Sequence, residues 1–155
     1  MMREEIKKIL TKYEPKEENL LAILHELQDS KETHHLTKEE LIEVSNYLKL
    51  PTSYIMSVLS FYSMYSIQPR GKYIIRVCQS PPCHHVGAVN IAKELMRVLG
   101  IGFGETTKDG LFTLEFTSCI GVCGVAPAMM INDEVYGNLT PEKIQSIIEE
   151  LRRKK

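Results

Sequence analysis

The sequence predicts a chain of mixed α and β structure (α+β or α/β), with a helical bundle over residues 1–66 and a β-α-β-β-β-α domain over residues 72–155. Two observations predict this organisation. Apolar residues recur at helical spacing in the first part, whereas short β-branched segments alternate with helical ones in the second. The run Gln68-Pro69-Arg70-Gly71 between them is typical of a linker.

Four helices are expected in the first part of the chain. Apolar residues at helical spacing mark the first two, around residues 6–13 and 20–27. The third begins at Thr37, because Thr37 and Glu40 have the spacing of a capping box, in which each side chain satisfies a backbone N–H of the other. Pro51 ends this helix and can stand in the first turn of the fourth.

The second part should alternate between strands and helices. The expected order is a strand at 73–77 ending at Cys78, a helix at 86–99, a strand at 111–116, a hairpin turned at 132–134 and a final helix beginning at Thr140. The glycines at 100–104 follow a helix and precede a strand, which predicts a helix end. A dinucleotide fingerprint needs the opposite order, so any nicotinamide site should belong to a partner.

Charge and the chain ends narrow the class of protein. The chain of 155 residues has 19 Lys and Arg against 20 Asp and Glu, a balance that argues against holding nucleic acid as the main task. Neither a secretory signal nor an apolar membrane span is recognisable, so we expect a cytoplasmic protein. In a reducing compartment, paired cysteines bind metal or do redox chemistry more often than they form structural disulfides.

The four cysteines form two close pairs, and each pair follows an expected strand. Cys78 and Cys83 are a C-x4-C pair, and Cys119 and Cys123 are a C-x3-C pair. Loops at the ends of neighbouring strands can face a common site, and four thiolates are what a [2Fe–2S] cluster needs, two for each iron. Structural zinc is an open alternative at these spacings, and a disulfide is a weaker one.

Residues beside the cysteines have properties that suit an anionic cluster. Cys83 is expected to precede a helix, whose N-terminal N–H groups favour an anion. Gly121 and Gly124 can adopt positive φ and turn backbone N–H groups towards sulfur. The adjacent prolines at 81 and 82 should stiffen the first loop.

These motifs resemble the thioredoxin-like [2Fe–2S] ferredoxin subunits of NADH-linked redox complexes. Members of that family include the small iron–sulfur subunit of NADH:quinone oxidoreductase, the gamma subunit of NAD(P)-linked [FeFe] hydrogenase, and relatives in formate dehydrogenases. The resemblance covers nearly the whole chain. It depends most on the sequences Pro82-Cys83, Cys119-Ile120-Gly121-Val122-Cys123-Gly124, Ala126-Pro127 and Tyr136-Gly137-Asn138-Leu139.

The resemblance implies a thioredoxin-like fold, one [2Fe–2S] cluster and a cis proline at Pro127. The ligands of the cluster would be Cys78, Cys83, Cys119 and Cys123. The chain would be a one-electron carrier that exchanges electrons with a flavoprotein subunit binding FMN and NAD(H), in a complex with further iron–sulfur and catalytic subunits. No catalytic residues are expected in the chain, and it is not expected to turn over substrate alone.

A zinc- or cluster-dependent regulator of helix-turn-helix type is the alternative function. Residues 51–69, where a recognition helix would lie, contain no Lys or Arg, so contact with DNA phosphates is not expected. The aromatic and methionine side chains of this segment are expected mainly in the core, with some at the helix end meeting a partner protein. His84 and His85 could form a Rieske-type site only if cysteines were lacking, so we expect them to be near the cluster but not ligands.

Overall fold

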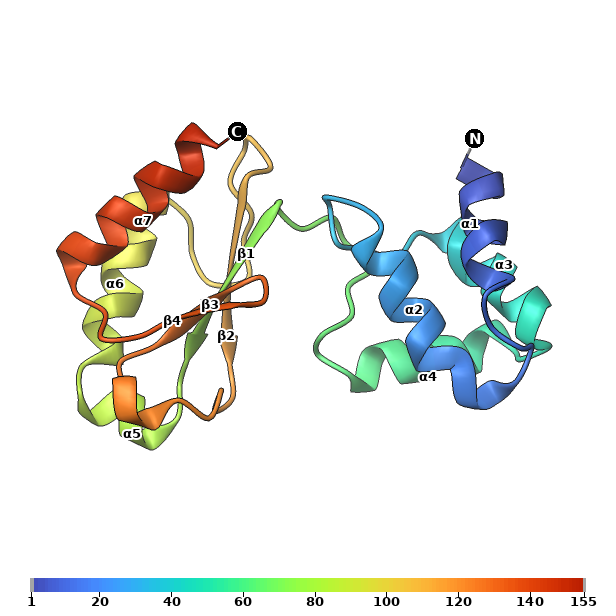
Figure 1. Ribbon diagram of the computed structural model, residues 1–155, viewed down its shortest axis with the longest axis horizontal. Coiled ribbons are helices and arrows are strands. Elements are labelled where there is room, and N and C mark those ends of the chain that lie inside the picture. Colours follow the sequence, from blue (N-terminus) through green and yellow to red (C-terminus); the bar gives the residue numbers. More distant parts are fainter. Residues whose placement is uncertain (1, 155) are drawn as a thin grey trace. The chain divides into compact units, whose positions relative to one another are not determined.

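The computed structural model describes residues 2–154, and the chain divides into two compact units, Met1–Arg70 and Gly71–Lys155 (Figure 1). Met1 and Lys155, the outermost residues of the two expected domains, lie outside the described residues. Within the described part, no helix is both long and apolar enough to cross a membrane.

The first unit is a small bundle whose helices pack through one apolar core. Its elements are α1 (Met2–Leu10), the 3₁₀ turn η1 (Glu17–Asn19), α2 (Leu20–Asp29), α3 (Lys38–Leu48) and α4 (Thr52–Phe61). Helices α1, α2 and α3 contact one another, and α4 packs on α3. The fully buried side chains include Ile23, Leu24, Val44 and Ile55, which come from three different helices. The four expected helices are therefore confirmed, although α1 ends at Leu10, before Tyr13.

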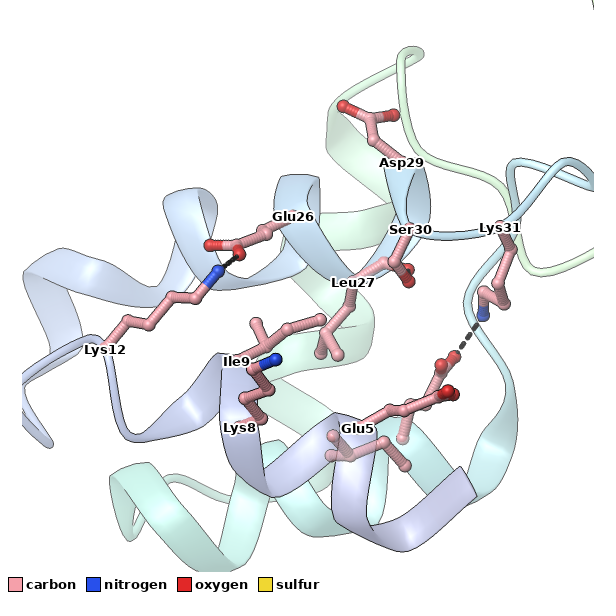
Figure 2. A pocket seen from close by; sticks show the side chains of 11 residues that line it. Glu5, Lys8, Ile9, Lys12, Glu26, Leu27, Asp29, Ser30 and Lys31 are labelled. Atoms are coloured by element: carbon pink, nitrogen blue, oxygen red, sulfur yellow. Dashed lines mark hydrogen bonds and ion pairs between the residues drawn. The ribbon is translucent and has the colours of Figure 1, made fainter. Parts of the chain in front are cut away.

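The predicted capping box at the start of α3 is confirmed. The backbone N–H of Glu40 donates to Thr37 Oγ1 at 3.3 Å, and the backbone N–H of Thr37 donates to Glu40 Oε2 at 2.8 Å. Glu40 is buried, and Lys31 pairs with its carboxylate. This ion pair and the pair between Lys12 and Glu26 border a cavity of about 630 Å³ next to α1 and α2 (Figure 2). The charges around the cavity therefore largely neutralise one another.

The second unit is a four-stranded sheet with helices, in the order β-α-α-β-β-β-α. Its elements are β1 (Tyr73–Cys78), α5 (Pro81–His85), α6 (Ala88–Leu99), β2 (Phe112–Thr117), the 3₁₀ turn η2 (Cys123–Val125), β3 (Met129–Ile131), β4 (Glu134–Tyr136) and α7 (Pro141–Arg153). The strand order is β2-β1-β3-β4. β1 is parallel to β2, while β3 is antiparallel to both of its neighbours. The predicted hairpin and the mixed fold are confirmed.

Helices α6 and α7 lie side by side and share one core with the sheet (Figure 1). Alternate residues of β1, Ile75 and Val77, point into this core, as the two-residue period of a strand requires. Leu95 of α6 and Ile144 and Ile148 of α7 meet them there, all fully buried. This packing fixes the sheet and hence the strand ends that carry the cysteines.

The expected helix over residues 86–99 differs at its N-terminus. Helix α6 begins at Ala88, two residues later than expected, and the short helix α5 precedes it. Cys83, which was expected to precede a helix, lies inside α5, so that expectation is wrong. Helices α5 and α6 are separated by Gly87 at φ 107°, a backbone conformation that few side chains tolerate. The predicted end at Gly100 is confirmed, since this residue is left-handed and its N–H donates to the Met96 carbonyl.

Candidate metal centre

The register of the sheet brings the two cysteine-bearing segments together at one end of β1. Cys78, the last residue of β1, lies opposite Thr117, the last residue of β2. The chain leaves β2 towards Cys119 from that point and returns at Ala128, whose carbonyl accepts a hydrogen bond of 3.3 Å from the Cys78 N–H. Both ends of the loop that carries Cys119 and Cys123 are therefore held beside Cys78.

Cys83 reaches the same place through the short helix α5. Ser80 precedes this helix, and Pro81 and Pro82 occupy its first turn, where a missing N–H costs no hydrogen bond. Cys78 and Cys83 are 1% and 2% exposed, and with Ala88 they form a separate buried cluster. Ile120 and Ala126, which come from the loop of the second cysteine pair, pack against this cluster. The two loops thus contact each other through apolar side chains.

Cys119 and Cys123 are exposed, and their sulfur atoms lie 4.0 Å apart. Gly121 has φ 80°, and its N–H donates to Cys119 Sγ at 3.4 Å, as predicted. Gly124 does not have positive φ, so the role we expected for it is wrong. It lies inside η2, whose backbone conformation any residue can adopt.

A glycine that the sequence analysis did not single out for this role supports the Cys123 loop. A Cβ on Gly137 would lie 2.4 Å from Val125 Cγ2 and 2.8 Å from the Val125 carbonyl oxygen. The N–H of Asn138 donates to that same oxygen at 2.5 Å. Val125 ends η2, which begins at Cys123. The close approach of Gly137 to Val125 therefore holds this turn against the segment that follows β4. No spacing pattern in the sequence indicates this contact.

The thiols influence one another's ionisation. Burial raises the pKa of Cys78. Hydrogen bonds with the Ser80 backbone, with Cys83 and with the Ile120 backbone together lower this pKa by more than burial raises it, so the net pKa is below its ordinary value. Burial raises the pKa of Cys83, and so does its neighbour Cys78. The hydrogen bond with Cys119 is the main cause of the raised pKa of Cys123. A positively charged metal bound between the loops would favour the thiolate forms of Cys78, Cys83 and Cys123.

The donor set suits a binuclear iron–sulfur cluster. Two thiolates on one tetrahedral metal, each about 2.3 Å from it, lie a little under 4 Å apart, which is close to the separation of Cys119 and Cys123. Cys78 and Cys83 form the second pair. Among residues 2–154, no three His, Cys, Asp or Glu side chains converge closely enough to hold a single metal ion, so the four cysteines are not gathered around one point. Neither cysteine loop, residues 78–87 or 117–128, contains an acidic residue that would repel an anionic cluster.

Two further predictions near the centre can be compared with the structure. The Ala126–Pro127 peptide bond is cis, as the resemblance implied. His84 and His85 are exposed on α5, next to the buried Cys83. The assignment of the four cysteines as the cluster ligands stays a prediction.

A thioredoxin-like domain that carries two pairs of cysteines on adjoining loops defines one class of iron–sulfur proteins. The model of the family described as thioredoxin-like [2Fe-2S] ferredoxin matches residues 6–152. The chain therefore belongs to the thioredoxin-like [2Fe–2S] ferredoxins, and its cofactor is one [2Fe–2S] cluster.

Several proteins of known name are similar to the chain. One of the subunits of NADH-quinone oxidoreductase from Mycobacterium tuberculosis (strain ATCC 25618 / H37Rv) is 36% identical over 146 residues, which are 94% of this chain and 57% of that protein. The HndA polypeptide of the NADP-reducing hydrogenase of Solidesulfovibrio fructosivorans is 33% identical over 135 residues, which are 87% of this chain and 78% of HndA. This chain therefore spans little more than half the length of the mycobacterial relative.

The crystal structure of an NAD+-reducing [NiFe]-hydrogenase in the air-oxidised state contains the same fold. The TM-score is 0.77 at 28% identity, and the match covers 88% of this chain and 23% of the hydrogenase chain. The fold of this chain is thus found in that hydrogenase within a much longer polypeptide.

Proposed function

We propose that this protein carries single electrons in a multisubunit oxidoreductase, through one [2Fe–2S] cluster bound by Cys78, Cys83, Cys119 and Cys123. One observation carries the proposal. The loop with Cys119 and Cys123 begins and ends beside Cys78, with Thr117 and Ala128 as its two fixed ends. Its relatives are named as subunits of an NADH-quinone oxidoreductase and of an NADP-reducing hydrogenase, which supports a place in such a complex.

The partner in this proposal is a flavoprotein subunit that binds FMN and NAD(H), together with further iron–sulfur and catalytic subunits. A flavin takes two electrons and a proton from NADH as hydride, whereas a [2Fe–2S] cluster takes one electron at a time. The chain's contribution is to hold its cluster near a surface. Cys119 and Cys123 are exposed while Cys78 and Cys83 are buried, so one side of the centre lies closer to a docked partner.

We also propose that the protein has two domains, a helical one over residues 1–66 and the cluster-binding one over residues 72–155. We propose further that it is cytoplasmic. The compact unit Gly71–Lys155 contains all four cysteines, which supports the second domain as the seat of the cluster.

The experiment is anaerobic reconstitution of the full chain with iron and sulfide, followed by dithionite reduction and EPR spectroscopy. We expect two irons per chain and a signal from one reduced cluster. Changing any of the four cysteines to Ser should remove or strongly weaken the signal, because oxygen is a poorer ligand for iron in such clusters than thiolate sulfur.

The matched control is Ser118→Ala, next to Cys119, which should leave the iron content unchanged. A colourless protein that binds one zinc and gives no EPR signal would contradict the proposal. A salt-sensitive shift of DNA by the chain would instead favour the regulator of helix-turn-helix type.

A further inference from the structure

The exposed cysteines, Cys119 and Cys123, lie against each other within one loop. Their sulfur atoms are 4.0 Å apart, which is within hydrogen-bonding distance for sulfur. Gly121, midway between them, has φ 80°, a backbone conformation typical of tight turns. Its N–H donates to Cys119 Sγ at 3.4 Å. The turn at Gly121 therefore brings the two thiols into contact although three residues separate them in the chain.

The two sulfur atoms need to move little to form a covalent bond. A disulfide bond is about 2 Å long, so the present separation of 4.0 Å must shrink by about 2 Å. A change of side-chain rotamer displaces a sulfur atom by a comparable distance. Residues 118–122 belong to no helix or strand, so the closure breaks no regular hydrogen-bonded element. The ring that forms is short, which keeps the entropy cost of closing it small.

The other two cysteines are protected from reagents in the solvent. Cys78 and Cys83 are 1% and 2% exposed, whereas Cys119 and Cys123 are both exposed. Side chains from the second loop pack over the buried pair and its neighbour Ala88. Oxidation of a thiol follows its exposure, because the oxidant must reach the sulfur atom. The exposed pair is therefore the one that a dissolved oxidant attacks.

Oxidation should also stay within a pair. Cys119 is hydrogen-bonded to Cys123, and Cys78 is hydrogen-bonded to Cys83. Among residues 2–154, no three side chains of His, Cys, Asp or Glu converge closely enough to hold one metal ion. A sulfur atom of the exposed pair thus has its own partner as its nearest reaction partner, and a bond between the two pairs is not expected.

A small-molecule disulfide is a suitable oxidant for the exposed pair. The sulfur of one cysteine attacks the small disulfide, breaks its S–S bond, forms a mixed disulfide and releases one small thiol. The second cysteine attacks the mixed disulfide, which closes the S–S bond of the protein and releases the second small thiol. The two protons of the protein thiols pass to the two released thiols. Two protein thiols are oxidised and one small disulfide is reduced, so atoms and electrons balance.

We infer that Cys119 and Cys123, when they hold no cluster, are a site of reversible exchange with small-molecule disulfides, and that the resulting disulfide and the cluster exclude each other. The exclusion rests on the proposed function, because it requires both sulfurs to be cluster ligands. An exposed disulfide is readily reduced, so small thiols reopen the site. The loop thereby makes insertion of the cluster depend on the ratio of small disulfides to small thiols.

The first test uses the full chain without its cluster, reduced, freed of reductant and incubated anaerobically with oxidised glutathione. The products are trapped with iodoacetamide in denaturant, digested with trypsin and measured by mass spectrometry. Each pair then lies in its own peptide, residues 77–93 or 109–143, because cleavage follows Arg76, Lys93, Lys108 and Lys143. We expect peptide 109–143 to lose two hydrogens and to resist alkylation, while 77–93 is alkylated at both cysteines. The disulfide should be about tenfold or more abundant in 109–143 than in 77–93.

Two variants test the order of the steps. Cys119→Ser has no second thiol in the loop, so Cys123 should keep glutathione as a mixed disulfide. Ser118→Ala is the matched control and should form the disulfide like wild type. The inference would be overturned by equal amounts of disulfide in the two peptides, by a bond between the peptides, or by a wild-type chain that retains both exposed thiols or holds glutathione without closing.

The second test repeats the incubation with the reconstituted full chain. The visible absorption of the cluster should persist, and peptide 109–143 should then be alkylated at both cysteines. A loaded chain that forms the disulfide while it keeps this absorption would overturn the exclusion. A reduced chain that takes up no iron and sulfide would overturn the proposed function instead, while the peptide measurement on the cluster-free chain would still decide whether the disulfide forms.

Discussion

Gly137→Ala should disturb the cluster loop from outside it. The added Cβ would lie 2.4 Å from Val125 Cγ2, 2.6 Å from Val125 Cβ and 2.8 Å from its carbonyl oxygen. Ordinary contact begins at 3.4 Å, so the two segments must separate by about 1 Å. They cannot do so freely, because the Asn138 N–H donates to the Val125 carbonyl oxygen at 2.5 Å.

The magnitude follows from this overlap. Forcing one extra methyl group into a packed site costs about 1–3 kcal/mol, and each kcal/mol lowers the melting temperature of a chain this size by about 2–4 °C. We therefore expect the melting temperature to fall by about 2–12 °C. Val125 ends the turn that begins at Cys123, so the iron retained after reconstitution should fall as well.

Circular dichroism melting and iron analysis measure the two effects. Gly124→Ala is the control, because it adds the same methyl group within the turn that Val125 ends, has nothing within 4 Å of its Cβ and does not have positive φ. It should melt like wild type and retain its iron. If Gly137→Ala were as stable as wild type, or if Gly124→Ala lost as much stability, the reasoning from the close approach would be wrong.

Two further changes test stabilising interactions outside the cysteine loops, one in each compact unit. Thr37→Ala removes the side-chain acceptor of the capping box and should destabilise the helical unit by about 1 kcal/mol, measured as a lower urea midpoint at unchanged slope. In the second unit, hydrogen bonds from Arg97 and then from Gln145 lower the pKa of Glu94 from 4.5 to about 2. Because the folded-state pKa is depressed, this contribution is present above pH 4.5 and lost as the pH falls towards 2. Wild type should therefore exceed Glu94→Gln in stability at neutral pH, and the gap should close over that acid range; a constant gap would contradict the assignment.

Much of the fold could be predicted because it depends on local patterns. The capping box at Thr37, the glycine end at Gly100 and the hairpin at 132–134 each involve residues a few positions apart, and all three are found in the structure. Boundaries were less predictable. The helix expected from residue 86 begins at Ala88, because Gly87 at φ 107° interrupts the helical backbone between α5 and α6.

The candidate site could be predicted in its residue types but not in its supports. Cysteine spacing indicates two pairs, yet it does not reveal that Ile120 and Ala126 pack on the buried pair. Nor does it distinguish Gly121, which needs its positive φ, from Gly124, which does not. Gly137 is far from the cysteines in sequence, and its importance comes from a contact with Val125 that only folding creates.

By itself, the sequence determined the mixed fold and the two pairs of thiols, because these depend on periodicity and on spacing along the chain. It also indicated the family, through the resemblance of its motifs to those of known members. Only the tertiary structure decided which cysteines are buried and which side chains of α4 reach the surface. The segment 51–69 shows the difference: its aromatic and methionine side chains were expected mainly in the core, with some at the helix end meeting a partner. The structure leaves Phe61, the last residue of α4, 79% exposed. Exposure depends on which elements cover one another, and a chain acquires that property only when distant segments meet.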